Sequence, residues 1–421
     1  MVSNRRIIAL RSFIISVGAT AAASFVGVYG VMIGASAAEM GWLQSSSNAL
    51  TNGGQLLWGK LSDRYGKRLP FLIIGSIILA VLWALMVMVT SPVQLIVVYA
   101  VLSLMSAMIT VNWFSLIAEI EDSATRGYFL SVINNFSSTG AIISLVILSF
   151  LLHSVARDII LVPFGLASGS YVVSAIMLSR IHESKRERVR IVSKTTFRQI
   201  REHKTFFSYF LAMNVQGFFW SMAWPVFPIT IVLVMHFDLS TVAILTAVSL
   251  SATVMMQVVV GKFVDNIKRP PLIFTNRVLL SMIPLFYAVF STFYEFVVLE
   301  LYSGVVGAIQ NVVMNSYVLD IVPDEQRGEY ISILNGFNGI MYFIGALAGG
   351  YLLQFFMGRY GLREALTFTY SFIIAGRFAS SFLFLRLKES ESRRGNRGFV
   401  YSLLLRFRTP GAPSGGVVKP R

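Results

Sequence analysis

The amino-acid sequence predicts an all-α integral membrane protein with twelve transmembrane helices in two pseudo-symmetric bundles of six. Of its 421 residues, 55% are hydrophobic and only 13% are charged, about half the charged share of a soluble globular chain. Long runs carry almost no charge, and the motifs that follow two of these runs recur about 200 residues later. A soluble core stops growing at about 250–300 residues, so this apolar surface points to lipid.

Composition also excludes several classes of function. The chain has no cysteine, which removes disulfides, Cys-ligated metals and thiol nucleophiles. Its four histidines lie far apart without metal-ligand spacing, so we expect no metal and no cofactor. The formal net charge of +15 is interpreted as membrane topology rather than as a nucleic-acid partner, because the charge follows the loops.

Twelve segments have the length of a bilayer-spanning helix, which needs about 20 mostly apolar residues. They are too long and continuous for barrel strands, which alternate over about 9–11 residues. The second segment carries amides and is expected to face protein or water. The segments are 12–38, 40–59, two within 69–118 separated at Thr90-Ser91-Pro92, 127–152, 159–179, 205–237, 239–261, 270–294, 296–319, 330–358 and 365–385.

The basic residues fall almost entirely on one side of these segments. Thirty of the 35 Lys and Arg lie at the termini or in alternate loops that share the same side, Arg11 among them. The positive-inside rule places that side in the cytoplasm. We therefore predict a multi-pass plasma-membrane protein with both termini and the central loop in the cytoplasm, in contact with membrane lipid and expected to be a monomer.

The same pattern divides the chain into four parts. Residues 1–181 are predicted to form the first bundle and residues 205–388 the second. Residues 182–204 form a basic cytoplasmic linker that would lie along anionic headgroups. The basic tail, residues 389–421, is rich in Gly and Pro near its end, which predicts disorder.

Three matches indicate an internal duplication. Gly-Lys-x-x-Asp begins at Gly59 and again at Gly261, 202 residues later. Arg126-Gly127 recurs 201 residues later as Arg327-Gly328, with the same spacing to a following Ser, Asn and Phe. The sixth and twelfth segments both end in Arg-[Ile/Leu]-x-Glu-Ser. Each half has six passes, so both halves are expected to have the same orientation.

The loop Gly59-Lys60-Leu61-Ser62-Asp63-Arg64-Tyr65-Gly66-Lys67-Arg68 resembles the loop 2–3 signature of the major facilitator superfamily, Gly-x-Leu-x-Asp-Arg-x-Gly-Arg/Lys-Arg/Lys. The resemblance covers residues 7–388. It implies two six-helix bundles that rock about a central cavity, and this superfamily is itself the usual example of such paired repeats.

The resemblance also implies a cytoplasmic latch. Asp63 would lie at the start of a helix in the opposite half, near Arg327, and Asp265 would repeat this contact near Arg126. Gly59 and Gly66 are expected to permit close backbone approach. The alternative is that the loops are only tight turns and positive anchors. The second copy departs from the pattern at residues 266–268, which favours a stronger latch in the first half. The gate residues are Gly59, Asp63, Arg64, Gly66, Arg68, Arg126, Asp265 and Arg327.

Ionisable residues inside the passes are candidates for function by default. Glu300 lies in the tenth pass and is a candidate for coupling to a proton, although an interfacial or paired acid is the favoured interpretation. Arg377 in the twelfth pass and Arg277 in the ninth are expected to pair structurally. A part in gating or in binding an anion stays the alternative for both.

By the same resemblance, passes 1, 4, 7 and 10 line the cavity. Amides with broad aromatic faces suit neutral or weakly amphipathic organic solutes, although amides also join helices and Trp also marks membrane interfaces. The candidates are Tyr29, Asn112, Trp113, Asn214, Gln216, Trp220, Trp224, Gln310, Asn311 and Asn315.

These observations favour a secondary or facilitative transporter of a small organic solute. The chain has no Gly-x4-Gly-Lys-Ser/Thr loop, so ATP is not expected to drive it. We favour efflux of amphipathic compounds. However, the family's proton antiporters often carry an Arg in the fourth helix and a Gly-Pro pair in the fifth, and both are missing here. Uptake of a neutral polar solute such as a sugar, and a receptor or scaffold that does not transport, stay open.

Overall fold

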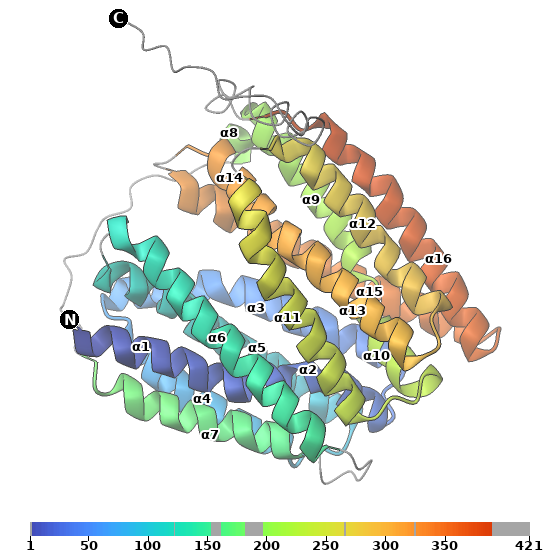
Figure 1. The fold of residues 1–421 in the computed structure, drawn as a ribbon, viewed down its shortest axis with the longest axis horizontal. Coiled ribbons are helices and arrows are strands. Elements are labelled where there is room, and N and C mark those ends of the chain that lie inside the picture. The colour runs from blue at the N-terminus through green and yellow to red at the C-terminus, as the bar shows by residue number, and fades with distance from the viewer. Residues whose placement is uncertain are drawn as a thin grey trace, which may run out of the picture.

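A computed structural model describes residues 2–121, 123–152, 161–181, 197–264, 267–323 and 326–389. Within these ranges the chain folds into helices and forms no strand (Figure 1), which confirms the all-α prediction. The start of the predicted linker, residues 182–196, and the tail beyond residue 389 lie outside the described residues.

Each predicted segment of the first half corresponds to a helical segment. The first pass is continuous through a short π-helix, η1, and the loops between the others are short. The helices are α1 (Val2–Ile15), η1 (Ser16–Thr20), α2 (Ala21–Met32), α3 (Ala37–Tyr65), α4 (Leu69–Met86), α5 (Pro92–Ile120), α6 (Ser123–Leu151) and α7 (Leu161–Leu178).

The second half repeats this order after a short connecting helix. Its seventh and tenth passes are each interrupted by a π-helix, and its last pass ends in a 3-10 turn. The helices are α8 (Phe197–Glu202), α9 (Lys204–Ser221), α10 (Val226–Ile229), η3 (Thr230–Val234), α11 (Leu239–Phe263), α12 (Arg269–Val289), α13 (Phe293–Ile309), η4 (Gln310–Met314), α14 (Asn315–Ile321), α15 (Arg327–Met357), α16 (Leu362–Ser381) and η6 (Phe382–Arg386).

Length and apolarity support most of the predicted spans. Among the described residues, ten helical segments are long and apolar enough to cross a bilayer, and the segment 162–178 is apolar but shorter. Helix α3 is 29 residues long but is not among the ten, in keeping with the amides predicted to face protein or water. The count of twelve spans therefore stays a prediction at α3 and α7.

Local sequence fixes several helix starts. Ser36 accepts a hydrogen bond from the Glu39 backbone N–H, while the Glu39 carboxylate accepts one from the Ser36 N–H, and this capping box begins α3. Thr292 and Glu295 form the same box at α13. Such boxes satisfy backbone N–H groups that a helix start leaves open. The acid at Glu39 is thereby accounted for as a cap.

The two bundles meet at one end of the molecule. We call the end that carries the 60–68 and 262–269 loops the basic end, and the opposite end the neutral end. Near the neutral end, Ser240 Oγ of α11 donates to the Ser149 carbonyl of α6 at 2.5 Å. Ser45 Oγ of α3 donates to the Phe343 carbonyl of α15 at 2.8 Å. Polar contacts therefore join the bundles there.

Glycines bring α3 and α15 together in the same region. A Cβ on Gly350 of α15 would lie 2.5 Å from the Ala37 carbonyl oxygen and 2.8 Å from the Gly41 Cα. No larger residue fits such an approach without a shift of backbone. The neutral end is thus closed by helices in direct backbone contact.

The basic end is open by comparison. The approach of α15 to α3 loosens toward this end: a Cβ on Gly339 would lie 2.8 Å from Asn52, one on Gly336 would lie 3.9 Å from Leu56, and one on Gly328 would meet no heavy atom within 4 Å. Figure 1 shows the first bundle, α1 to α7, and the second bundle, α9 to α16, converging near α2 and α10 and diverging toward the N-terminus and α8. The structure is therefore a state closed at the neutral end and parted at the basic end.

Candidate functional site

A cavity of about 360 Å³ lies in the second bundle, a volume in the range of small-molecule sites. Residues of α9, α12, η4, α14 and α15 surround it. Its lining combines amides, aromatic rings and aliphatic side chains with a single cation. The lining residues are Tyr209, Met213, Trp220, Arg277, Gln310, Asn311, Met314, Asn315, Val318, Leu319, Ile331, Leu334, Asn335, Asn338 and Tyr342.

The tenth pass supplies the polar side of this cavity. Gln310, Asn311 and Asn315 all line it, and both asparagines are exposed. They sit where α13 passes through the π-helix η4 into α14. A π-bulge inserts one residue into an α-helix and often marks a functional site. The predicted amide cluster of this pass is therefore brought together at one surface.

The seventh and eleventh passes supply an aromatic wall. Trp220 and Tyr342 line the cavity with their rings edge-to-face at 5.8 Å. Trp224, one turn further along, packs against both rings, with centroids 5.5 Å from Trp220 and 5.1 Å from Tyr342. Trp224 thus supports the wall without being among the residues that line the cavity.

The other candidates of the seventh pass face the bundle interior. Asn214 is buried and donates to the Phe210 carbonyl of its own helix at 2.7 Å. Gln216 is buried and accepts a hydrogen bond from Ser380 of α16. Neither residue lines the cavity, and these contacts match the interpretation of amides as links within and between helices.

The candidates of the first half lie away from this cavity. Tyr29 is buried, packs edge-on against Phe164 at 5.5 Å and donates to the Val89 carbonyl. Asn112 is fully buried and donates to the Met108 carbonyl of its own helix. Trp113 lies under the guanidinium of Arg11. The structure therefore does not bring these three to the cavity of the second bundle.

Arg277 is the cation of the cavity. Its side chain is 1% exposed and lines the cavity from α12. Its Nη1 lies 3.4 Å from Gln310 Oε1, its Nη2 lies 3.8 Å from Met213 Sδ, and its Nε has no hydrogen-bond partner. The guanidinium stands 5.4 Å from the Phe384 ring. A buried cation is thus held by weak neutral contacts.

Arg377 is equally buried but fully bonded to backbone. Its guanidinium donates to the carbonyls of Phe219 and Trp220 in α9 and of Leu280 in α12, at 3.3, 2.6 and 3.2 Å. The last carbonyls of a helix lack partners within that helix, and α9 ends at Ser221. This arginine therefore caps a broken helix.

A proline explains the third bond. Pro284 lies inside α12, four residues after Leu280. Proline has no N–H, so the carbonyl four residues earlier loses its usual donor. Arg377 of α16 supplies that donor, which joins three passes of the second bundle and supports the interpretation of Arg377 as structural.

Glu300 lies apart from the cavity. It is half-buried on α13 beside Ser249 of α11 and is absent from the cavity lining. Close by, a Cβ on Gly304 would lie 2.6 Å from the Ser249 carbonyl, so the two helices are in tight contact. Glu300 therefore lies beside the contact between α13 and α11, and a part in proton coupling stays a prediction.

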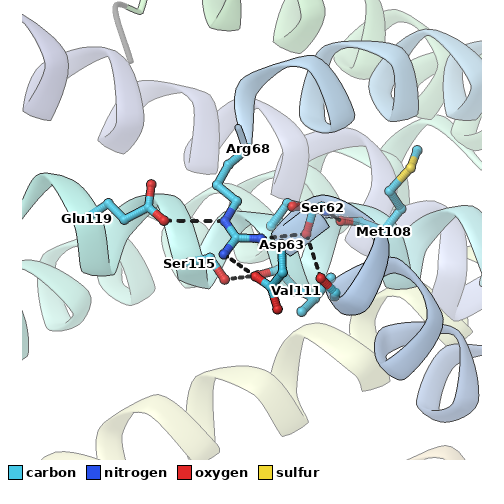
Figure 2. A network of polar contacts seen from close by, with 9 residues as sticks. Ser62, Asp63, Arg68, Met108, Val111, Ser115 and Glu119 are labelled. Atoms are coloured by element: carbon cyan, nitrogen blue, oxygen red, sulfur yellow. Dashed lines mark hydrogen bonds and ion pairs between the residues drawn. The ribbon is translucent and has the colours of Figure 1, made fainter. Parts of the chain in front are cut away.

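The loop of the first bundle forms a compact polar network (Figure 2). Arg68 donates to Asp63 at 2.5 Å and to Ser62 Oγ at 2.6 Å, and its Nε pairs with Glu119 of α5 at 3.3 Å. Gly66 ends α3 with a φ of +67°. Glycine is favoured at this position because the left-handed backbone conformation is unfavourable for other residues. The expected close approach at Gly66 is wrong, because its surroundings are open.

The remaining gate residues do not show the latch. Arg64 is exposed, and Arg327 donates to the Leu319 carbonyl of its own bundle at 3.2 Å. A Cβ on Gly59 would touch only Val111, at 3.4 Å. Asp265 lies outside the described residues, and the side chain of Arg126 is not described. The latch therefore stays a prediction for another state of the molecule.

Sequence reasoning missed several residues that the structure places at polar sites. Tyr209, Asn335, Asn338 and Tyr342 line the cavity. The last three follow helical spacing on one face of the eleventh pass, a signal that a helical-face analysis would have found. Arg11, which the sequence places among the basic residues of the cytoplasmic side, is 3% exposed, donates to Ser174 at 2.8 Å and stands 4.1 Å over an indole ring.

Solved structures of transporters share this fold. A point mutant of the nucleoside transporter NupG has a TM-score of 0.72 at 13% identity, with 91% of this chain and 100% of that chain covered. A bacterial homologue of the human lysosomal transporter Spinster, inward-facing and occupied, has 0.70 at 14%, with 91% and 96% covered. The D-xylose–proton symporter has 0.70 at 12%, with 93% and 99% covered.

No curated protein matches the sequence. A sequence-family model described as "Major Facilitator Superfamily" matches twice, over residues 8–216 and 209–409, so that its matches span almost the whole chain. The helices, the two bundles and the cavity agree with that match, and the chain belongs to the Major Facilitator Superfamily.

Proposed function

We propose that the protein moves a small organic solute across the plasma membrane by alternating access, without ATP. The observation that carries this proposal is the cavity of about 360 Å³, which is lined by the exposed Asn311 and Asn315 and by the rings of Trp220 and Tyr342, in a bundle that parts from its partner at one end (Figure 1). A cavity lined by amides and aromatic rings is typical of a ligand-binding site and is not suited to contact with lipid.

The distribution of basic residues assigns a direction to the captured state. With the basic loops in the cytoplasm, the open basic end faces the cytoplasm and the closed neutral end faces outward. The molecule is then an inward-facing state, and transport requires the neutral-end contacts between α3 and α15 to separate. Bundles that rock about a shared site are the general form of such cycles.

Efflux of amphipathic compounds is the mode that we favour. Trp220, Tyr342, Leu334 and Met314 line the cavity with rings and aliphatic chains, and these suit an apolar body. Uptake of a neutral polar solute such as a sugar is the second candidate, because the five amides that line the cavity could hydrogen-bond to hydroxyl groups.

Counterflow in proteoliposomes tests the proposal. Purified protein is reconstituted, loaded with each member of a panel of amphipathic compounds, nucleosides and sugars, and assayed for exchange of labelled solute with and without a pH gradient. We expect saturable exchange of at least one solute, reduced about 10-fold in Asn311→Leu and Asn315→Leu because a charge-free hydrogen bond contributes about 1 kcal/mol and an unpaired solute group costs more.

Gln354→Leu is the matched control. Gln354 is an exposed amide on α15 outside the cavity lining, so its loss should leave exchange unchanged. No exchange of any solute under either gradient would contradict transport, and saturable binding without exchange would favour the receptor alternative.

A further inference from the structure

We propose that the solute carries an anionic group, a carboxylate, sulfonate or phosphate, that pairs with the Arg277 guanidinium. This inference rests on the proposed function of the cavity and names the chemical class of its ligand. It combines a negatively charged head at Arg277 with an apolar or aromatic body along Trp220 and Tyr342.

The first step is the charge balance of the cavity. Among the described residues that line it, Arg277 is the one cation and none is acidic. Within the described ranges no ion pair of Arg277 occurs. Its hydrogen-bond partners are an amide oxygen at 3.4 Å and a thioether at 3.8 Å, and its Nε is unbonded. An anion in the cavity would neutralise this charge.

The second step is a comparison with the other buried arginines of the described chain. Arg269 pairs with Asp320, and Arg377 donates to three backbone carbonyls. Arg11 donates to a serine and lies 4.1 Å over an indole ring, which also stabilises a cation. An unbonded nitrogen is not peculiar to Arg277, because Arg11 Nη2 also lacks a hydrogen-bond partner. Arg277 differs in that its hydrogen bonds, at 3.4 and 3.8 Å, are the longest of the four described sets and its ring contact, at 5.4 Å, is more distant than that of Arg11, and burial of a weakly compensated charge is costly.

The third step is the internal repeat. Helices α4 and α12 correspond at an offset of 201, which aligns Arg68 with Arg269 and Ser76 with Arg277. In the first bundle Ser76 is fully buried and its Oγ lies 3.3 Å from Ser174 Oγ. The fold accommodates a small neutral residue at this place, so the architecture itself does not require the arginine.

The fourth step is the rest of the lining. Asn338 is 5% exposed, lines the cavity and has an unbonded Oδ1. Such a buried acceptor loses free energy until a donor reaches it. A hydroxyl or amine on the solute would satisfy Asn338 while its acid satisfies Arg277. The amide, the guanidinium and the aromatic wall together fit an amphipathic organic acid.

A matched set of probes tests this class on the wild-type protein. Equilibrium dialysis measures the Kd of 2-naphthoate, 2-naphthalenesulfonate and 2-naphthyl phosphate, with 2-naphthamide as the neutral counterpart of the same shape. We expect at least one acid to bind saturably and at least about 10-fold tighter than the amide, since hydrogen bonds to charged groups contribute roughly 1.5–3 kcal/mol. Equal binding of acids and amide, or no binding of any acid, overturns the proposal.

Two variants locate the effect. Arg277→Gln should weaken the acid by about 10- to 100-fold and leave the amide unchanged, whereas Arg277→Lys should retain part of the preference because it keeps the charge. Arg359→Gln, which removes an exposed arginine that stacks on Phe355 at 3.9 Å, is the control. An unchanged acid affinity in monodisperse Arg277→Gln overturns the proposal. If that variant does not fold, the comparison of acid with amide in wild-type and Arg277→Lys protein decides.

Counterflow separates this inference from the proposed function. Exchange of the neutral amide or of a sugar, at equal rates in wild-type protein and Arg277→Gln, would overturn the anionic ligand and leave transport intact. Saturable acid binding without any exchange would uphold the ligand class and contradict transport.

Discussion

Arg68 and Arg269 occupy the same place in the two bundles, 201 residues apart. Arg68 pairs with Glu119 at the end of α5, and Arg269 pairs with Asp320 in α14, and the two acids are again 201 residues apart. Each pair ties the start of one pass to the end of the next at the basic end. The duplication therefore repeats side-chain contacts as well as helices.

The arginine of the second pair is more deeply buried, although the two acids are equally exposed at 22% and 23%, and this predicts an asymmetry. The Arg269 side chain is 4% exposed, whereas that of Arg68 is 15% exposed and also bonds to Asp63 and Ser62. Asp320→Asn should therefore destabilise the protein by about 2–3 kcal/mol, and Glu119→Gln by about 1 kcal/mol or less. Thermal unfolding in detergent measures both. An equal or larger effect of Glu119→Gln would refute this explanation.

A double-mutant cycle tests the bond from Arg377 to the proline-freed carbonyl. Arg377→Gln should destabilise the second bundle by about 3 kcal/mol or more, because three carbonyls lose their donor. Pro284→Ala restores an N–H to the Leu280 carbonyl. The cost of Arg377→Gln should thus be about 0.5–1.5 kcal/mol smaller in the Pro284→Ala background.

Thermal unfolding of the four proteins gives the coupling free energy. Pro225→Ala, at the break of the seventh pass, is the comparison, because the carbonyl four residues before Pro225 is that of Ser221, whereas Arg377 donates to those of Phe219, Trp220 and Leu280. Additive effects of Arg377→Gln and Pro284→Ala would mean that the Leu280 bond does not stabilise the fold.

The glycine contact between α3 and α15 predicts a shift between conformations. In Gly350→Ala the new Cβ would lie 2.5 Å from the Ala37 carbonyl oxygen, so the closed neutral end is destabilised and the opposite state gains population. Gly336→Ala on the same helix is the control, because its Cβ would have one neighbour, at 3.9 Å. Both substitutions replace a glycine by alanine inside α15, so they raise the helix propensity by the same amount and differ only in the contact of the new Cβ.

The measurement uses the lack of native cysteine. Spin labels at Lys60→Cys and Ser332→Cys, two exposed positions of α3 and α15 near the basic end, report the separation of the bundles there. Gly350→Ala should shorten the mean distance, and Gly336→Ala should leave it unchanged. A longer or unaltered distance in Gly350→Ala would show that this contact does not favour the captured state.

Asp63 distinguishes a latch from a simple turn. Its side chain is 54% exposed and pairs with Arg68, and exposed pairs contribute about 0–1 kcal/mol. Asp63→Asn should therefore leave the unfolding temperature nearly unchanged. If Asp63 latches the basic end in another state, the exchange rate in proteoliposomes should still fall several-fold. An unchanged rate would support the simple-turn interpretation.

Sequence reasoning predicts the passes well because lipid imposes a simple rule on them. An uncharged run of about 20 residues has few alternatives to a helix, and each of the twelve ranges overlaps a helical segment, while the count of twelve spans stays a prediction at α3 and α7. The internal repeat also predicts that the two halves have the same orientation, so that their corresponding loops lie at the same end of the molecule. Depth of burial is harder to predict, because Arg11 has the sequence context of a loop charge although it is 3% exposed in the structure.

The cavity is predicted in part for a similar physical reason. Asn311 and Asn315 share a helical face, which spacing reveals. Which of two buried arginines is bonded and which faces a cavity depends on carbonyls freed by Pro284 and by the break after Ser221. Those carbonyls belong to α9 and α12 rather than to α16, so no pattern along the twelfth pass indicates that Arg377 is bonded.

The hydrogen bonds from Arg377 to α9 limit where the seventh pass can bend. Arg377 of α16 binds the end of α9 and joins it to α12. The part of the seventh pass that can still bend beside Pro225 is therefore the short stretch formed by α10 and η3. That stretch touches the first bundle, where a Cβ on Gly27 would lie 2.9 Å from the Pro228 ring. We expect α9 to move as a rigid body and the stretch formed by α10 and η3 to bend. The contact between that stretch and the first bundle should then separate before α9 moves.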